Sequence, residues 1–118
     1  MSGFSYTREE RLSGNNEYDR VFTEGKAFRT RSLTTLATPN PCGVSRIGLS
    51  VGRRVGSAVR RNRIKRVLRE AYRLNKAELS IPCDIVFIPR RGLEKVGLRV
   101  IEPEVRHILR KIDETFSA

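Results

Sequence analysis

The stretch RRVGSAVRRNRIKRVLREAYR, residues 53–73, decides how this chain is expected to fold. Its second half repeats apolar residues at spacings of three and four, which is the period of a helix with one buried face. Ser57 follows Gly56 and belongs to a residue type that caps helix N-termini, so we expect the helix to begin close to Ala58. The residues expected to face the core are Ile64, Val67, Leu68, Ala71 and Leu74.

The rest of this segment is strongly basic. Arg60 and Arg61 fall in the first turn of the expected helix, where their charges oppose the helix dipole. Residues 53–73 hold nine basic side chains and one acidic one, Glu70, and so supply +8 of the formal net charge of +11. Because the remaining charge is nearly balanced, the excess forms a patch, which indicates a negatively charged partner. The side chains expected opposite the core face are Asn62, Lys65, Arg66, Arg69 and Arg73.

This patch is compatible with four kinds of surface: an ordinary solvated helix, a membrane-binding face, a DNA-binding helix and an RNA-binding face. An ordinary solvated helix alternates the sign of its charges, which this one does not. A membrane surface is disfavoured because no Trp, Phe or Leu interrupts the basic face. A DNA-binding helix-turn-helix needs a second helix just upstream, whereas residues 46–56 have the pattern of a strand and a turn. We therefore expect RNA, bound through phosphate contacts and aromatic stacking, and neither DNA nor a membrane.

Upstream of the basic segment, one helix and two strands are predicted. Tyr18, Val21 and Phe22 have helical spacing, and Gly25 is expected to end that helix. Residues 28–38 are rich in Thr and partly alternating, which predicts one strand, followed by a turn at PNPCG. Residues 46–52 alternate again and predict a second, half-buried strand.

Downstream, the apolar run 85–88 predicts a central strand covered on both faces. Residues 89–98 are expected to form a loop. A terminal amphipathic helix is expected from about Pro103. Helices thus alternate with strands, which favours one α+β layered domain spanning residues 1–118, with the basic helix on a sheet. The apolar face of the terminal helix comprises Val105, Ile108, Leu109, Ile112 and Phe116.

Composition sets further limits on function. The chain has 118 residues, 38% of them hydrophobic, with no run of about 18 apolar residues and no signal peptide, so a cytoplasmic protein is expected. Cys42 and Cys83 are far apart and lack metal-ligand spacing, so we expect reduced cysteines. The single histidine, His107, is expected at the surface. Because no catalytic or phosphate-loop motif occurs, we expect a protein that binds and does not itself catalyse.

The basic segment closely resembles the signature of the protein subunit of bacterial ribonuclease P. The hallmark of that family is an Arg-Asn-Arg motif in a similar basic helix, matched here by Arg61, Asn62 and Arg63. Further matches are RL at 11–12, YDRVF at 18–22, EGK at 24–26, RIGLSV at 46–51 and CDIVFIPR at 83–90.

This resemblance implies both a fold and a function. The implied fold is an α+β two-layer sandwich with a mixed, about four-stranded sheet and a left-handed βαβ crossover, of the ribosomal protein S5 domain 2-like type. In the family, a catalytic RNA uses Mg²⁺, bound mainly by that RNA and the substrate, to remove the 5′ leader of precursor tRNA. The protein binds the catalytic RNA and the leader, and is not expected to be catalytic alone or to self-associate.

The resemblance also implies site residues. Arg53 and Arg54 stand where the family has Ser-Lys-Lys, with Gly52 in place of the serine, so the charge is kept without the hydroxyl. Leu36 stands where the leader cleft has a third aromatic, and we expect weaker base stacking there. The implied contacts to the catalytic RNA are Arg53, Arg54, Arg60, Arg61, Asn62, Arg63, Lys65, Arg66 and Arg69, and the implied leader cleft comprises Tyr18, Phe22, Leu36, Lys65 and Arg69.

Two alternatives stay open at this point. From spacing alone, Tyr18 and Phe22 would sooner be core residues than cleft residues, because aromatics four apart on a helix usually pack inward. The same basic patch would also serve a ribosomal-protein-like binder of rRNA. Recovery of rRNA without a ribonuclease P RNA in a pull-down from cell extract would favour that second function.

Overall fold

The computed structural model describes residues 8–90 and 97–117 of the chain. Its three short 3₁₀ turns are η1 (Arg8–Glu10), η2 (Arg53–Val55) and η3 (Lys76–Glu78). The longer elements are α1 (Gly14–Glu24), β1 (Lys26–Arg29), β2 (Leu33–Pro39), β3 (Arg46–Leu49), α2 (Ala58–Asn75), β4 (Cys83–Pro89) and α3 (Leu98–Ser117).

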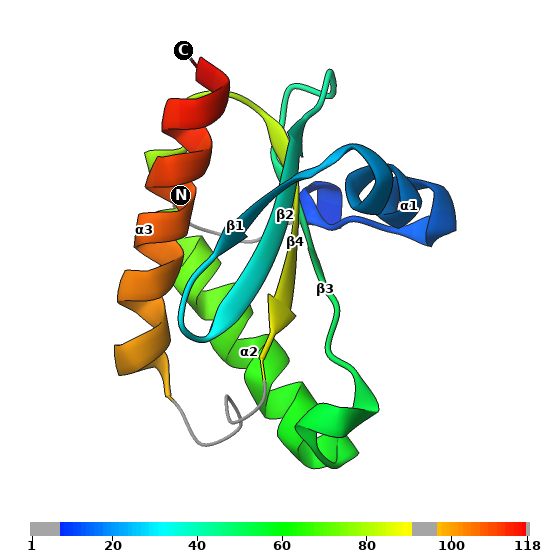
Figure 1. Cartoon of the computed structure of the whole chain (residues 1–118), viewed down its shortest axis with the longest axis vertical. Helices are drawn as coiled ribbons and strands as arrows, with labels where there is room; N and C mark the ends of the chain where they lie inside the picture. The colour runs from blue at the N-terminus through cyan, green and yellow to red at the C-terminus, as the bar shows by residue number, and fades with distance from the viewer. Residues whose placement is uncertain (1–7, 91–96, 118) are drawn as a thin grey trace.

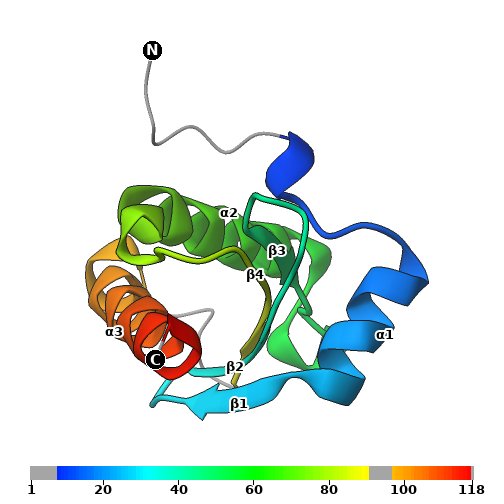
Figure 2. The same cartoon turned by 90° about the horizontal axis from the view of Figure 1, so that it is seen from above.

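The four strands form one mixed sheet in the order β1-β2-β4-β3. The β1–β2 and β2–β4 pairs are antiparallel, whereas β3 and β4 are parallel and are joined through α2. Helices α2 and α3 cover one face of the sheet, and α1 lies against the other (Figures 1 and 2). The expected α+β architecture with a mixed four-stranded sheet is thus confirmed, and α1 adds a partial third layer. The left-handedness of the β3–α2–β4 crossover stays an implication of the resemblance.

The core has two parts, one on each face of the central strand β4. The larger part fills the space between the sheet and the helices α2 and α3, and the smaller part lies beneath α1. All residues of Cys83–Phe87 are buried, because neighbouring strands pair with both edges of β4 and helices cover both faces. The prediction of a central strand covered on both faces is confirmed. The buried residues beneath α1 are Leu12, Val21 and Val86.

Helix α2 begins at Ala58, as predicted, and the Ser57 hydroxyl accepts a hydrogen bond from the Arg60 amide at 3.4 Å. The prediction of which α2 residues face the core is correct except at the C-terminal end of the helix. Leu74, expected inside, is 41% exposed, whereas Tyr72 is 1% exposed. Near this end Tyr72 is flanked by the loop that precedes β3, and Asn75 donates to Glu102 of α3 at 3.1 Å, so the buried face turns away from Leu74.

The single strand predicted over residues 28–38 is wrong, because the chain forms the hairpin β1–β2 there. The turn is closed by a hydrogen bond from the Thr30 amide to the Leu33 carbonyl at 2.9 Å. Glu104 of α3 then accepts from the Thr30 hydroxyl at 2.7 Å, the Ser32 amide at 3.0 Å and the Ser32 hydroxyl at 2.7 Å. No Gly, Pro or Asn marks this turn, so a distant carboxylate supplies what the local sequence lacks.

Helix α3 begins at Leu98, so the predicted start near Pro103 is also wrong. A proline in this position forgoes only its own amide bond to the Arg99 carbonyl, and Ile101 in the preceding turn is fully buried. The first turns are therefore held by packing. Residues 91–96 of the predicted loop lie outside the described residues. None of the helices in the described ranges is long and apolar enough to cross a membrane.

The two cysteines are free thiols in different environments, and His107 is exposed, as expected. Cys42 is exposed, whereas Cys83 is buried in β4, where desolvation and the nearby carboxylates of Asp113 and Asp84 raise its pKa to about 11. Because the thiolate is the reactive form, iodoacetamide at about pH 8 is expected to modify Cys42 and spare Cys83 until urea unfolds the chain. Mass spectrometry of tryptic peptides checks this, and comparable labelling of both thiols in the native protein would refute it.

Candidate nucleic-acid interface

The Arg-Asn-Arg motif lies in the N-terminal half of α2, directly after η2. Gly56 joins η2 to α2 with a φ of 148°, a backbone conformation that side chains other than glycine rarely adopt. Arg61 is half-buried, and its Nη1 donates to the Gly56 carbonyl at 3.4 Å. The other predicted residues of this region are exposed: Arg53, Arg54, Arg60, Asn62, Arg63 and Arg66.

Within residues 8–90 and 97–117, the single acid of the basic segment is already paired. Glu70 is bound by Arg73, with Nε–Oε1 and Nη2–Oε2 distances of 2.9 and 2.6 Å. That hydrogen bond lowers the pKa of Glu70 and raises the pKa of Arg73. The positive field of the helix is therefore left for an external anion. In residues 8–90 and 97–117, no salt bridge to a carboxylate is made by Arg53, Arg54, Arg60, Arg61, Lys65, Arg66 or Arg69.

A hollow of about 170 Å³ lies between the α1 side of the molecule, β3 and α2. Lys65 and Arg69 of α2 are half-buried at its wall. The Arg69 Nε atom is buried and has no hydrogen-bond partner among the residues that the structure describes. Burying a charged donor without an acceptor is costly, so this atom indicates a place for an anion. The lining residues are Arg11, Leu12, Tyr18, Ile47, Gly48, Leu49, Lys65 and Arg69.

Tyr18 reaches the hollow because β3 carries a glycine beneath it. A Cβ atom on Gly48 would lie 2.5 Å from the Tyr18 Oη and 2.6 Å from its ring carbons. The ring therefore lies directly against the strand backbone. Leu12, which precedes α1, donates its amide to the Ile47 carbonyl at 2.9 Å and fixes the start of this segment on β3.

Gly48→Ala is expected to lower the free energy of unfolding by about 1–3 kcal/mol, because the new methyl group overlaps the Tyr18 ring. Urea denaturation measures the change. Gly52→Ala is the matched control, since a Cβ atom there meets nothing within 4 Å and its φ is −80°. Equal effects of the two substitutions would contradict the close packing of Tyr18 on β3.

The other two residues of the predicted cleft lie outside the lining of this hollow. Phe22 is 47% exposed on α1, so it is not a core residue. Leu36 is half-buried on β2 and packs into the smaller core cluster beneath α1. The structure thus brings Tyr18, Lys65 and Arg69 together at one hollow and leaves Phe22 on the surface of the same helix as Tyr18.

A buried carboxylate, which the sequence reasoning missed, fixes α1 on the sheet. Asp84 of β4 is fully buried and accepts from Arg46 Nε at 2.8 Å, Arg46 Nη2 at 2.7 Å and Arg20 Nη1 at 2.9 Å. Asn40 donates to the same carboxylate at 2.8 Å. The bond to Asp84 raises the pKa of Arg46, whose Nη1 also reaches Glu17 of α1 at 2.9 Å. The sequence did offer a signal for this network. Asp84 is an acid within an apolar strand, and a buried acid must be paired with a cation or a hydrogen-bond donor.

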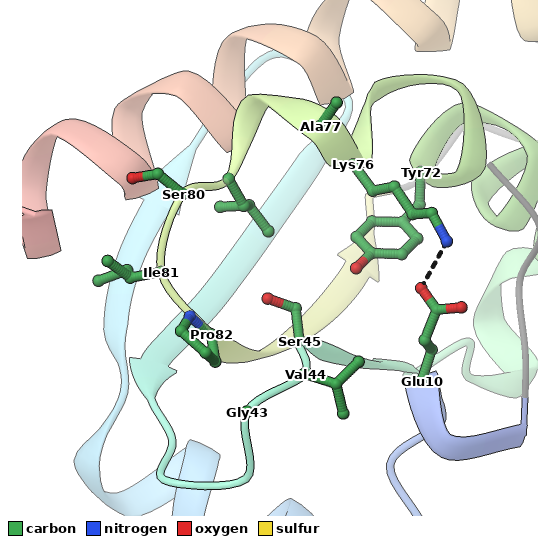
Figure 3. Close-up of a pocket in the computed structure, with 11 residues that line it drawn as sticks. Glu10, Gly43, Val44, Ser45, Tyr72, Lys76, Ala77, Ser80, Ile81 and Pro82 are labelled. Carbon is green, nitrogen blue, oxygen red and sulfur yellow. Dashed lines mark hydrogen bonds and ion pairs between the residues drawn. The ribbon is translucent and has the colours of Figure 1, made fainter. Parts of the chain in front are cut away.

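A larger cavity of about 350 Å³ lies towards the C-terminal end of α2 (Figure 3). The Lys76 ammonium there is 2.8 Å from a Glu10 carboxylate oxygen. The Ser80 amide and hydroxyl both donate to Asp113, each at 2.7 Å. Because these polar groups already have partners within the chain, size alone does not make this cavity the candidate site.

The interface offers little to a metal ion held by the protein alone. Magnesium prefers carboxylate, carbonyl and water oxygens, whereas the side chains gathered here are mainly arginines and lysine. In the described ranges, no three His, Cys, Asp or Glu side chains form a cluster that could hold a metal. The charged groups of this surface are suited to phosphates instead.

Comparisons with known proteins agree with this geometry. The family model described as Ribonuclease P matches residues 6–113. The ribonuclease P protein component of Finegoldia magna is 40% identical over 101 residues, covering 86% of this chain and 88% of that protein. Its counterpart from Thermotoga maritima is 35% identical over 113 residues, covering 92% and 97%.

Solved structures show the same relationship. The Thermotoga maritima protein superimposes with a TM-score of 0.78 at 33% identity, covering 86% of this chain and 96% of that one. The Staphylococcus aureus protein gives a TM-score of 0.78 at 27% identity, covering 87% and 94%. This chain therefore belongs to the bacterial ribonuclease P protein family and is a subunit of that ribonucleoprotein endoribonuclease, which matures the 5′ ends of tRNA.

Proposed function

We propose that the chain acts as one RNA-binding domain that presents two adjacent surfaces to two RNAs in the cytoplasm. The exposed N-terminal half of α2, together with η2, binds the catalytic RNA. The hollow beside Tyr18 binds the 5′ leader of precursor tRNA. The observation that carries the second assignment is the pair of half-buried cations, Lys65 and Arg69, that line one hollow beside Tyr18, where the buried Arg69 Nε lacks an acceptor among the described residues.

The hollow has the two kinds of group that single-stranded RNA requires. A leader phosphate in the hollow would supply a counter-charge for both Arg69 and Lys65. The tyrosine ring at the hollow and the exposed ring of Phe22 on the same helix can stack on bases, whatever their sequence. Leu36, which packs beneath α1, provides no ring for stacking.

The outer face of α2 has a different chemistry. Its arginines are exposed and lack aromatic neighbours on the same face, which suits contact with the phosphates of a folded RNA. We expect magnesium to be held mainly by phosphate oxygens of the catalytic RNA and the substrate, because oxygen ligands of this kind are the ones that it prefers. The contribution of the protein is to fix the leader relative to the catalytic RNA.

Reconstitution with a bacterial ribonuclease P RNA tests this function. The complex is expected to bind precursor tRNA more tightly than mature tRNA, and the RNA alone is expected to discriminate less. Lys65→Ala/Arg69→Ala should remove about 2–3 kcal/mol of that preference, because two charge-assisted contacts are lost. The same preference in the variant complex would refute the assignment of the hollow to the leader.

The control variant for this experiment removes the same number of positive charges as Lys65→Ala/Arg69→Ala. Arg99→Ala/Lys111→Ala removes two exposed cations from α3, which covers the other face of the sheet (Figure 2). This variant should retain the preference for precursor tRNA. Purified protein without any RNA subunit should leave precursor tRNA uncut, and cleavage at normal rates would place the chemistry in the protein.

A further inference from the structure

The structure points to a second cation site for the leader at the far edge of the sheet. We propose that a leader long enough to pass the hollow crosses the uncovered half of the sheet and binds Arg29 and Arg31 through its phosphates. This inference rests on the proposed function, because it extends the path of the same RNA. Neither arginine belongs to the basic segment around α2.

The strand register places Arg29 on the α1 side of the sheet. Arg29 of β1 pairs with Thr34 of β2, which pairs in turn with Ile88 of β4. Directly paired residues share a face, and residues two apart along a strand share it too. Ile88 belongs to the cluster that packs beneath α1, so Arg29 projects from the same face as the Tyr18 hollow.

Helix α1 covers only one half of that face. Its ion pairs reach Asp84 and Arg46, and its Tyr18 ring lies over Gly48. Towards the other end of the strands, Thr34 and Ile88 remain partly accessible and Arg29 is exposed. An open strip of sheet thus runs from the hollow at β3 across β4 and β2 to the edge strand β1.

Among the strand residues that the structure describes, none places an unpaired negative charge on this strip. Across the four strands the only acidic residue is Asp84, which is buried and bound by two arginines at the covered end. Glu104 keeps its negative charge, but it reaches the hairpin turn from α3, on the face of the sheet opposite to Arg29, where its carboxylate accepts hydrogen bonds from Thr30 and Ser32. Within the described part of the chain, Arg29 and Arg31 form no salt bridge.

Those same hydrogen bonds fix the backbone beside Arg31. Glu104 ties the turn between β1 and β2 to α3, so the backbone on either side of Arg31 is fixed before any RNA binds. Preorganisation of this kind reduces the ordering entropy that binding must overcome. Three strand spacings separate β3 from β1, about 14 Å, which a single strand of a few nucleotides spans.

Leader length provides the test. The reconstituted complex should bind precursor tRNA with a leader of about ten nucleotides more tightly than one with a leader of about two. Arg29→Glu/Arg31→Glu should weaken binding of the long-leader substrate about fivefold and leave the short-leader substrate unchanged. Arg99→Glu/Lys111→Glu is the matched control, because it makes the same charge change on α3 and should affect both substrates equally.

The outcomes separate this inference from the proposed function. If the unmodified complex binds precursor tRNA no better than mature tRNA, the leader assignment itself fails. If the unmodified complex prefers long leaders and Arg29→Glu/Arg31→Glu keeps that preference, only the β1 site fails. Equal losses for short and long leaders in this variant would show a general effect of charge and would also overturn the β1 site. Urea denaturation of each variant confirms that the hairpin remains folded.

Discussion

Asp84→Asn is expected to lower the free energy of unfolding by about 3–5 kcal/mol, because it breaks a buried ion pair from one side. The Asp84 carboxylate is fully buried and receives Arg46 through two nitrogens and Arg20 through one. An amide would remove the buried charge that the two arginines share, so Arg46 would keep only Glu17 and Arg20 only Glu24 as acidic partners. The NH₂ group of the amide would also face donors instead of accepting from them. Urea denaturation monitored by circular dichroism measures the change.

Asp19→Asn is the matched control for that measurement. Asp19 lies exposed on α1, so the same chemical change there should shift stability by no more than about 0.5 kcal/mol. If Asp84→Asn proved as mild as Asp19→Asn, the buried network would not be what fixes α1. The network also positions Tyr18, so Asp84→Asn should reduce discrimination between precursor and mature tRNA at temperatures where the variant remains folded.

Arg63→Ala/Arg66→Ala should weaken binding to the catalytic RNA by about 2–3 kcal/mol, which is about 30- to 150-fold. Both side chains are exposed on the outer face of α2 and neither lines the Tyr18 hollow. Because each phosphate contact releases counterions, the slope of log K against log salt should become shallower by about 1.4–1.8 for the pair. Filter binding over a range of salt concentrations gives both quantities.

The control for this experiment is again Arg99→Ala/Lys111→Ala, which removes the same charge from the neighbouring helix α3. A basic protein binds RNA partly through its overall field, so this variant should show a small loss of affinity and a nearly unchanged slope. Equal losses in the two double variants would mean that the charge total, not the surface of α2, governs binding.

The sequence predicted those elements whose signals are local. The capping serine at position 57 and the apolar period that follows it determine α2, and the run in β4 is apolar because both faces of that strand are covered. The resemblance supplied the residues of the interface. Three of its five cleft residues, Tyr18, Lys65 and Arg69, do line one hollow.

The sequence did not predict the features that depend on contacts between distant segments of the chain. The turn of the β1–β2 hairpin is held by Glu104 from α3, and Ser32 was its only local signal, because no Gly, Pro or Asn lies in it. Pro103 is tolerated inside α3 because Ile101, in the turn before it, is buried in the core. Likewise, the packing of Tyr18 depends on Gly48, whose role becomes visible only once β3 and α1 are brought together.

The central claim is that two adjacent surfaces of one domain hold two different RNAs, and site-specific crosslinking tests it most directly. The photocrosslinking residue benzoylphenylalanine is placed at one of three positions: Asn62 on α2, Phe22 on α1 or Lys111 on α3. In each case it replaces an exposed side chain. In the reconstituted complex with precursor tRNA, position 62 should label the catalytic RNA, position 22 the leader, and position 111 neither. Labelling of the same RNA from positions 62 and 22, or labelling from position 111 as strong as from either, would contradict the account.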